Sequence, residues 1–273
     1  MVRALWTAAS GMIGQQNNVD TIANNLSNVN TVGYKTETNE FKSLLYQTIQ
    51  TRTTTANGEN KPVGAQVGLG VRNAAITSQF KQGSLTASES DTAFAINGEG
   101  FFGVRGEDGN TYYTRNGNFV FSVGANNQMT LSNTDGLPVL NTAGNPITIP
   151  ANYIASKVEV DADGRLMYPD ANNNMQLIPN MTIGLYQFQN PSGLEKMGDT
   201  LYHATAASGA ALNEATNANL KKSEVRQGYL EASNVQVADE MVNLIIAQRA
   251  YEMNSKAVQA ADTMMQEANE LRR

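Results

Sequence analysis

Apolar positions recur with heptad spacing at both ends of the chain and alternate with polar positions in between. Near the N-terminus the first row is Leu5, Met12, Val19 and Leu26, and a second row follows three residues later at Ala8, Gln15, Ile22 and Val29. Two rows with this spacing form the a/d seam of a coiled-coil helix. The pattern predicts a helix over residues 5–29, with Gly33 as its C-terminal stop.

The last part of the chain repeats this pattern. Its first row is Val237, Leu244, Tyr251, Val258 and Met265, and its companion row is Ala247, Asn254, Ala261 and Ala268. At a rise of 1.5 Å per residue, each terminal helix would be about 40–50 Å long. Because both helices present one narrow apolar stripe and belong to one chain, we expect them to pair with each other as a coiled coil.

The N-terminal helix has few charges on the face away from its seam. Only Arg3 and Asp20 are charged between Met1 and Tyr34, and Gly11 and Gly14 each weaken a helix by about 1 kcal/mol relative to Ala. The polar residues of this face are Gln16, Asn17, Asn18, Asn24, Asn25 and Asn28. Uncharged hydrogen-bonding side chains of this kind favour contact with protein, either with neighbouring copies in a repeated assembly or within the monomer.

Between the helices the pattern changes to short alternating runs separated by Gly, Asn and Asp, which is typical of strands and turns. Residues 46–70 are rich in Thr, Gly and Asn, and predict an extended linker or a hairpin that turns at Asn57 and Gly58. The sequence therefore predicts an α+β chain in which a β-rich domain is inserted between two long terminal helices. The expected segments are residues 1–45 (helical), 46–70 (linker or hairpin), 71–227 (β-rich) and 228–273 (helical).

Composition narrows the classes of partner. The net charge is −6 and the sequence pI is about 4.9, with no basic block, so we expect neither nucleic-acid binding nor attachment to an anionic membrane surface. There is no cysteine, which removes disulfides and thiolate metal sites. We find no cleavable signal peptide and no 18-residue apolar stretch, so a protein that leaves the cytoplasm would need another export route.

One motif suggests a cofactor. Gly98, Gly100 and Gly103 have the G-x-G-x-x-G spacing of dinucleotide-binding loops. Those loops need a helix directly after the glycines to hold the pyrophosphate, whereas the residues that follow alternate and then turn at Asp108 and Gly109. We therefore expect a hairpin and no cofactor, with the glycines at turn and close-approach positions and Phe101 and Phe102 on opposite faces of a strand.

No other motif predicts chemistry. Asp161, Asp163 and Gly164 resemble part of a calcium loop, but they lie between two alternating runs, where a hairpin turn is the better interpretation. His203 is the only histidine, which leaves no two-histidine metal site. We predict no catalytic, cofactor-binding or metal site.

Both ends of the chain resemble the flagellar rod and hook proteins. Residues 10–35 contain Ser-Gly, Asn-Asn-Leu-x-Asn and Thr-x-Gly-aromatic-Lys, and residues 228–265 contain Glu-x-Ser-Asn-Val and Gln-Arg-Ala-Tyr-Glu. The runs AINGEGFFGV and YTRNGNF are similar to β-domain motifs of the larger rod and hook members. Residues 41–49, the chain length and the Thr-rich segment resemble the distal rod members, although residues 46–70 depart in composition from the versions expected.

The resemblance implies a structural, non-enzymatic subunit of the bacterial flagellar basal body, exported uncleaved through the flagellar type III apparatus. It implies a homopolymer in which terminal helices form inner layers of a tube that transmits torque to the hook. Implied partners are the proximal rod proteins, the hook protein and the surrounding ring proteins. The expected assembly residues are Leu5, Met12, Val19, Ile22, Asn24, Asn25, Leu26, Asn28, Val29 and Gly33 at one end, and Val237, Leu244, Gln248, Arg249, Tyr251, Val258 and Met265 at the other.

Three alternatives stay open at this point. A proximal rod or hook paralogue belongs to the same class, and its place along the axial structure would distinguish it. A secreted β-domain that binds a carbohydrate or cell-wall ligand would keep its activity without the terminal helices. An NAD-dependent enzyme would bind its cofactor in a titration.

Overall fold

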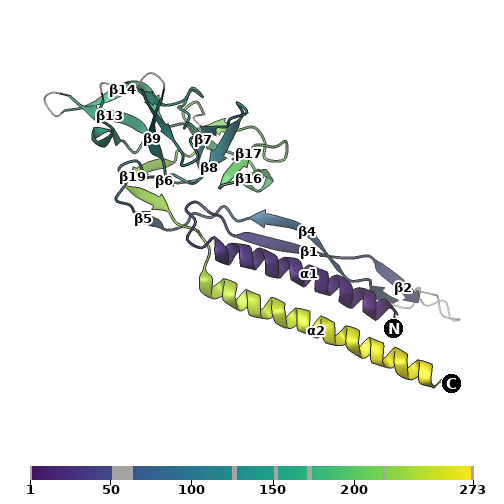
Figure 1. Ribbon diagram of the computed structural model, residues 1–273. Helices are drawn as coiled ribbons and strands as arrows, with labels where there is room; N and C mark the ends of the chain where they lie inside the picture. Colours follow the sequence, from purple (N-terminus) through teal and green to yellow (C-terminus); the bar gives the residue numbers. More distant parts are fainter. Residues whose placement is uncertain are drawn as a thin grey trace, which may run out of the picture. The chain divides into compact units, whose positions relative to one another are not determined.

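The computed structural model confirms an α+β chain with an N-terminal helix, a β-rich middle and a C-terminal helix (Figure 1). It describes residues 2–50, 64–124, 128–150, 153–170, 174–217 and 219–271. The chain forms two compact units, which are described separately. Unit 1 comprises residues 1–27, 37–78 and 236–273, and unit 2 comprises residues 28–36 and 79–235.

Unit 1 contains both long helices and two strand pairs. Its elements are α1 (Val2–Ser27), β1 (Glu37–Ser43), β2 (Tyr46–Gln50), β3 (Ala65–Gly68), β4 (Val71–Ser78) and α2 (Val237–Glu270). Helix α1 contacts α2 and also the ribbon made by β1 and β4, beside which it lies in Figure 1. Helix α1 ends at Ser27, so Gly33 is not its C-terminal cap.

The glycines of α1 lie where neighbouring elements approach the helix. A Cβ atom on Gly11 would lie 2.9 Å from Asn254 Nδ2 of α2, and one on Gly14 would lie 3.2 Å from the ring of Phe41 in β1. Ser10, next to Gly11, accepts a hydrogen bond from the backbone N–H of Val71 at 3.3 Å. The low helix propensity of the two glycines is therefore offset by close packing on two sides of α1.

The strands of unit 1 form an antiparallel ribbon. β1 pairs with β4 and β2 pairs with β3, and backbone hydrogen bonds between Leu44 and Gly70 and between Leu69 and Leu45 connect the two ladders. The segment predicted as linker or hairpin thus begins and ends in paired strands. Its expected turn at Asn57 and Gly58 lies outside the described residues.

Unit 2 is built from short antiparallel strands. They are β5 (Leu85–Ala87), β6 (Phe94–Asn97), β7 (Phe101–Arg105), β8 (Thr111–Thr114), β9 (Val120–Val123), β10 (Met129–Ser132), β11 (Thr148–Ile149), β12 (Glu159–Val160), β13 (Arg165–Pro169), β14 (Met175–Thr182), β15 (Leu185–Gln187), β16 (Glu195–Gly198), β17 (Leu201–His203), β18 (Leu212–Asn213), β19 (Glu224–Gln227) and β20 (Tyr229–Glu231), with 3₁₀ turns at Ala155–Lys157 and Pro191–Gly193. The largest sheet has the order β16-β17-β8-β7-β15-β18. Two smaller pairs, β6 with β19 and β5 with β20, join strands far apart in the sequence.

Two apolar clusters lie on opposite faces of β7. Phe102 belongs to the larger cluster, together with Phe94, Ile96 and Val225. Phe101 belongs to a smaller aromatic cluster that includes Tyr113, Phe188, Leu194 and Tyr202. The prediction that Phe101 and Phe102 point to opposite faces is confirmed, and each is almost completely buried.

The G-x-G-x-x-G run connects β6 to β7, and β7 continues into an antiparallel hairpin with β8. The hairpin predicted after the glycines is therefore confirmed. A Cβ on Gly100 would lie 2.6 Å from Glu214 Oε1, and a Cβ on Gly98 would lie 2.5 Å from the Ser223 hydroxyl. Ser223 and Glu214 form a buried hydrogen-bonded pair, so these glycines make room for protein side chains. The Asp161–Gly164 turn between β12 and β13 is likewise confirmed.

Unit 2 should lose stability at alkaline pH. Burial raises the pKa of Tyr113 to about 12 from an ordinary value near 10, with Tyr186 as a second cause. The unfolded chain releases this proton first, so stability falls as pH rises from 10 towards 12, by up to about 2–3 kcal/mol. We expect denaturant unfolding followed by tyrosine circular dichroism to show this loss.

The matched variant is Tyr113→Phe. It removes the titrating hydroxyl from a residue for which the structure gives ring contacts with Tyr186 and Phe188, and these contacts are kept. Its stability should fall less steeply between pH 10 and 12. An unchanged slope would show that Tyr113 does not cause the alkaline loss.

Candidate assembly site: the helical faces and a buried ion-pair cluster

The predicted seam of α2 is covered only in part, because Val237, Tyr251 and Ala268 are exposed. Ala247 and Ala261 are buried, while Leu244, Val258 and Met265 are half-buried. On α1, Ala8 and Ile22 are buried, and the other apolar seam residues are half-buried. The two helices contact each other, and these rows supply part of the covered surface of each helix.

Asn25 connects three elements of unit 1. Its side-chain amide donates to the backbone oxygen of Glu37 at 2.8 Å and accepts from the Glu37 N–H at 2.9 Å. It also donates to Glu240 Oε2 of α2 at 3.3 Å. Asn25 is 1% exposed, so this member of the uncharged face serves contacts inside the monomer.

A second apolar stripe on α2 is exposed. At 100° per residue, Val242, Ile246, Met253 and Met264 lie on one side of the helix, away from the seam. Their side chains are 54–65% exposed. On α1, Trp6 and Ile13 lie seven residues apart and are 71% and 63% exposed. Contiguous exposed apolar residues of this kind mark protein–protein contact surfaces.

The predicted assembly residues fall into three groups. Leu5, Met12, Val19, Ile22, Leu26, Leu244, Val258 and Met265 lie on the buried or half-buried seams. Asn24, Val237, Gln248, Arg249 and Tyr251 are exposed on the helices, where Arg249 pairs with Glu252 at 2.9 Å. Asn25, Asn28, Val29 and Gly33 are buried or half-buried, the last three in unit 2.

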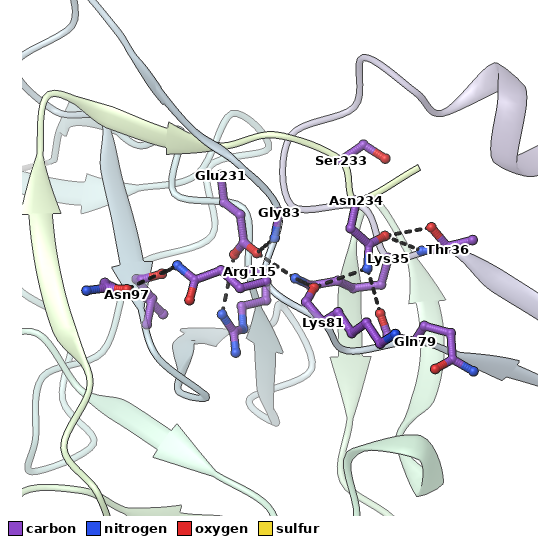
Figure 2. A network of polar contacts seen from close by, with 12 residues as sticks. Lys35, Thr36, Gln79, Lys81, Gly83, Asn97, Arg115, Glu231, Ser233 and Asn234 are labelled. Atoms are coloured by element: carbon purple, nitrogen blue, oxygen red, sulfur yellow. Dashed lines mark hydrogen bonds and ion pairs between the residues drawn. The ribbon is translucent and has the colours of Figure 1, made fainter. Parts of the chain in front are cut away.

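Unit 2 holds a buried cluster of charges formed by Lys35, Arg115 and Glu231 (Figure 2). Lys35 Nζ lies 2.6 Å from Glu231 Oε1, and Arg115 Nη1 lies 3.3 Å from Glu231 Oε2. The three side chains are 0–2% exposed. The Arg115 guanidinium also lies 4.9 Å from the centre of the Phe101 ring, which connects the cluster to the aromatic core.

The cluster joins segments that are distant in sequence. Glu231 ends β20, Arg115 directly follows β8, and Lys35 precedes β1, so Lys35 and Glu231 are 196 residues apart. Burial lowers the pKa of Lys35 and of Arg115, and in each case the charge of Glu231 opposes this effect. Glu231 is therefore the main source of charge compensation for both cations, and Glu214 adds a smaller contribution at Arg115.

Asn234 extends the cluster. Its side-chain oxygen accepts hydrogen bonds from the backbone N–H and the hydroxyl of Thr36, both at 2.7 Å. Its amide donates to the backbone oxygens of Gln79 and Lys81, and Lys35 Nζ also donates to Lys81 O (Figure 2). One asparagine thus holds together the chain segments that contain Thr36 and Gln79.

Glycine is required at position 33 by the positive backbone angle φ and by the close approach of Arg115. Its φ is +71°, and a Cβ there would lie 2.7 Å from the backbone carbon of Arg115. We expect Gly33→Ala to lower the free energy of unfolding of unit 2 by more than about 2 kcal/mol, since strain and collision add. Denaturant unfolding checks this value.

Gly136→Ala is the matched control. Gly136 has φ of +83° in the same unit, but a Cβ there would meet open space. It should cost about 1 kcal/mol, the strain alone. Equal losses in the two variants would mean that the contact with Arg115 carries no cost.

Sequence reasoning missed Arg115 and Glu231 as a pair. Both lie inside motifs that were recognised, YTRNGNF and Glu-x-Ser-Asn-Val, but no local spacing connects them. The sequence does contain one sign of this cluster, which lies in the chemical type of the residues. Lys35, Arg115 and Glu231 are charged residues inside otherwise uncharged motifs, in a chain with only 16% charged residues.

Two further properties bear on function. Among the described residues no group of three or more His, Asp or Glu side chains could hold a metal ion. Of the described helices, neither combines the length and apolar character that crossing a membrane requires.

Comparison with known proteins identifies the family. Family models match residues 5–35 (Flagella basal body rod protein), 95–168 (Flagellar hook protein FlgE/F/G D1 domain) and 226–271 (Flagellar basal body rod FlgEFG protein C-terminal). The chain is 43% identical to the flagellar basal-body rod protein FlgG of Borreliella burgdorferi over 100% of both chains. It is 40% identical to FlgG of Caulobacter vibrioides, over 99% of this chain and 100% of the relative, and 35% identical to FlgG of Bacillus subtilis over 100% of both.

The matched segments contain the residues of the two sites. Residues 5–35 carry most of α1 and end at Lys35, residues 95–168 include Phe101 and Arg115, and residues 226–271 include Glu231, Asn234 and α2. The resemblance to flagellar rod proteins is thereby confirmed. The chain belongs to the FlgG family of flagellar basal-body rod proteins and is a structural subunit of the basal-body rod.

Proposed function

We propose that the chain forms the distal part of the rod by assembling with its own copies into a tube that transmits torque to the hook. The observation that carries this proposal is the pair of apolar surfaces on unit 1. Helices α1 and α2 contact each other and part of each seam is buried, which supports coiled-coil pairing within the chain. The outer stripe of α2 and the row formed by Trp6 and Ile13 are exposed in the part of the chain that the structure describes.

A second copy of the chain is the partner that suits these rows. The outer stripe of α2 runs from Val242 to Met264, so neighbouring copies can stack helix against helix over several turns. Contacts of this kind bury apolar area without directional polar groups, and a repeated tube needs the same contact for every subunit. The proposed role is non-enzymatic.

The other partners follow from the place of a distal rod in the flagellum. The proximal rod proteins would contact one end of the polymer, the hook protein the other, and ring proteins would surround it. The flagellar type III apparatus would export the chain. The rival within the family is a role in the proximal rod or hook.

Gold labelling of isolated hook–basal bodies tests this assignment. A chain carrying an epitope tag should be labelled on the rod segment next to the hook. Label along the hook, or only on the segment nearest the inner membrane, would overturn the distal assignment and favour the corresponding paralogue.

A further inference from the structure

The strands that complete unit 2 come from the end of its sequence. The buried strand β6 pairs with β19, and β5 pairs with β20. The backbone N–H of Ala232 donates to Ser84 O, and that of Gly33 donates to Glu231 O. Residues 28–36 and 79–97 therefore find hydrogen-bond partners in residues 224–235, which are synthesised last in the unit.

The packing of the apolar core also depends on residues from the end of the unit. Val225 of β19 is 2% exposed and lies in the larger apolar cluster with Phe94 and Ile96. These contacts join residues about 130 positions apart, so their formation requires closure of a very long loop. Until residues 224–227 arrive, β6 lacks both its ladder partner and part of its core.

The charge cluster opposes closure before that point. Packing β8 against β7 places Arg115 over Phe101 and buries its guanidinium, and closure of residues 28–36 buries Lys35. Without Glu231 both cations would be buried with no carboxylate between them, which costs several kcal/mol. An open chain keeps both cations hydrated, so it is favoured until Glu231 is available.

We propose that residues 224–235 are the closing segment of unit 2, and that Glu231 makes closure all-or-none. A chain that emerges N-terminus first keeps unit 2 open until nearly all of its 273 residues are available. The inference concerns folding order and does not depend on where along the flagellum the subunit lies.

Pulse-labelled hydrogen exchange during refolding of the full chain tests this order. Amides of β7 and β8 should gain protection in the same kinetic phase as those of residues 229–231. Protection of β7 and β8 in a distinct phase, about fivefold or more faster, would overturn the proposal, because the sheet would then close without Glu231.

A second test uses variants in which glutamine replaces a glutamate and so removes one negative charge. Glu231→Gln should slow the protection of β7 and β8 by about tenfold or more, or abolish it. Glu224→Gln is the matched control, since Glu224 is exposed in β19 and lies in the same segment. Equal rates in Glu231→Gln and wild type would contradict the role assigned to Glu231.

Discussion

Glu231→Gln is expected to lower the free energy of unfolding of unit 2 by about 3–5 kcal/mol, which is much of the stability of a typical domain. Glutamine keeps the shape of the side chain but removes the carboxylate that pairs with both Lys35 and Arg115. Chemical denaturation followed by tyrosine circular dichroism reports mainly on unit 2, which contains eight of the ten tyrosines. Far-ultraviolet circular dichroism of helices reports on unit 1 separately, because both long helices lie there.

The number of buried charges that each variant leaves unpaired predicts the order of the stability losses. Lys35→Met leaves Arg115 facing Glu231, one cation with one anion, so it should cost less than Glu231→Gln. Exposed Glu224→Gln should change stability by no more than about 0.5 kcal/mol. If Lys35→Met costs as much as Glu231→Gln, uncompensated charge does not explain the cluster.

Ile246→Glu should abolish assembly while the monomer stays folded. Ile246 is 60% exposed in the single chain, so the substitution disturbs little there. In the polymer we propose that it is buried between copies, where an unpaired carboxylate costs several kcal/mol. The concentration needed for polymerisation should rise about 100-fold or more, as measured by sedimentation and electron microscopy.

Gln259→Glu provides the comparison. It introduces a similar charge at an exposed position of α2, away from the outer stripe. It should assemble at close to the wild-type concentration. If both variants lose assembly to the same extent, net charge on α2 matters and the outer stripe has no specific role.

The two helices could be predicted because their signal is local. Heptad spacing repeats within each helix, and every residue needed to recognise it lies within a few turns. The same holds for the hairpin after Gly103, whose turn residues Asp108 and Gly109 lie in one short run. At the two helices and this hairpin, the structure agrees with what the short-range sequence pattern predicts.

The elements that were not predicted depend on distant partners. β1 has a mostly exposed, weakly alternating sequence, and it forms a strand because it pairs with β4 and contacts α1. The contact between Lys35 and Glu231 spans 196 residues and leaves no periodic trace in the sequence. The roles of Gly11 and Asn25 likewise became visible only once α2 and β1 were placed beside α1.

A side-chain-resolution electron cryomicroscopy structure of filaments assembled from the full chain would test the central proposal most directly. We predict that Trp6, Ile13, Ile246 and Met253, all exposed in the single chain, are buried between copies along helical contacts. Copies joined only through their β-rich units, with these four side chains still exposed to solvent, would contradict the account.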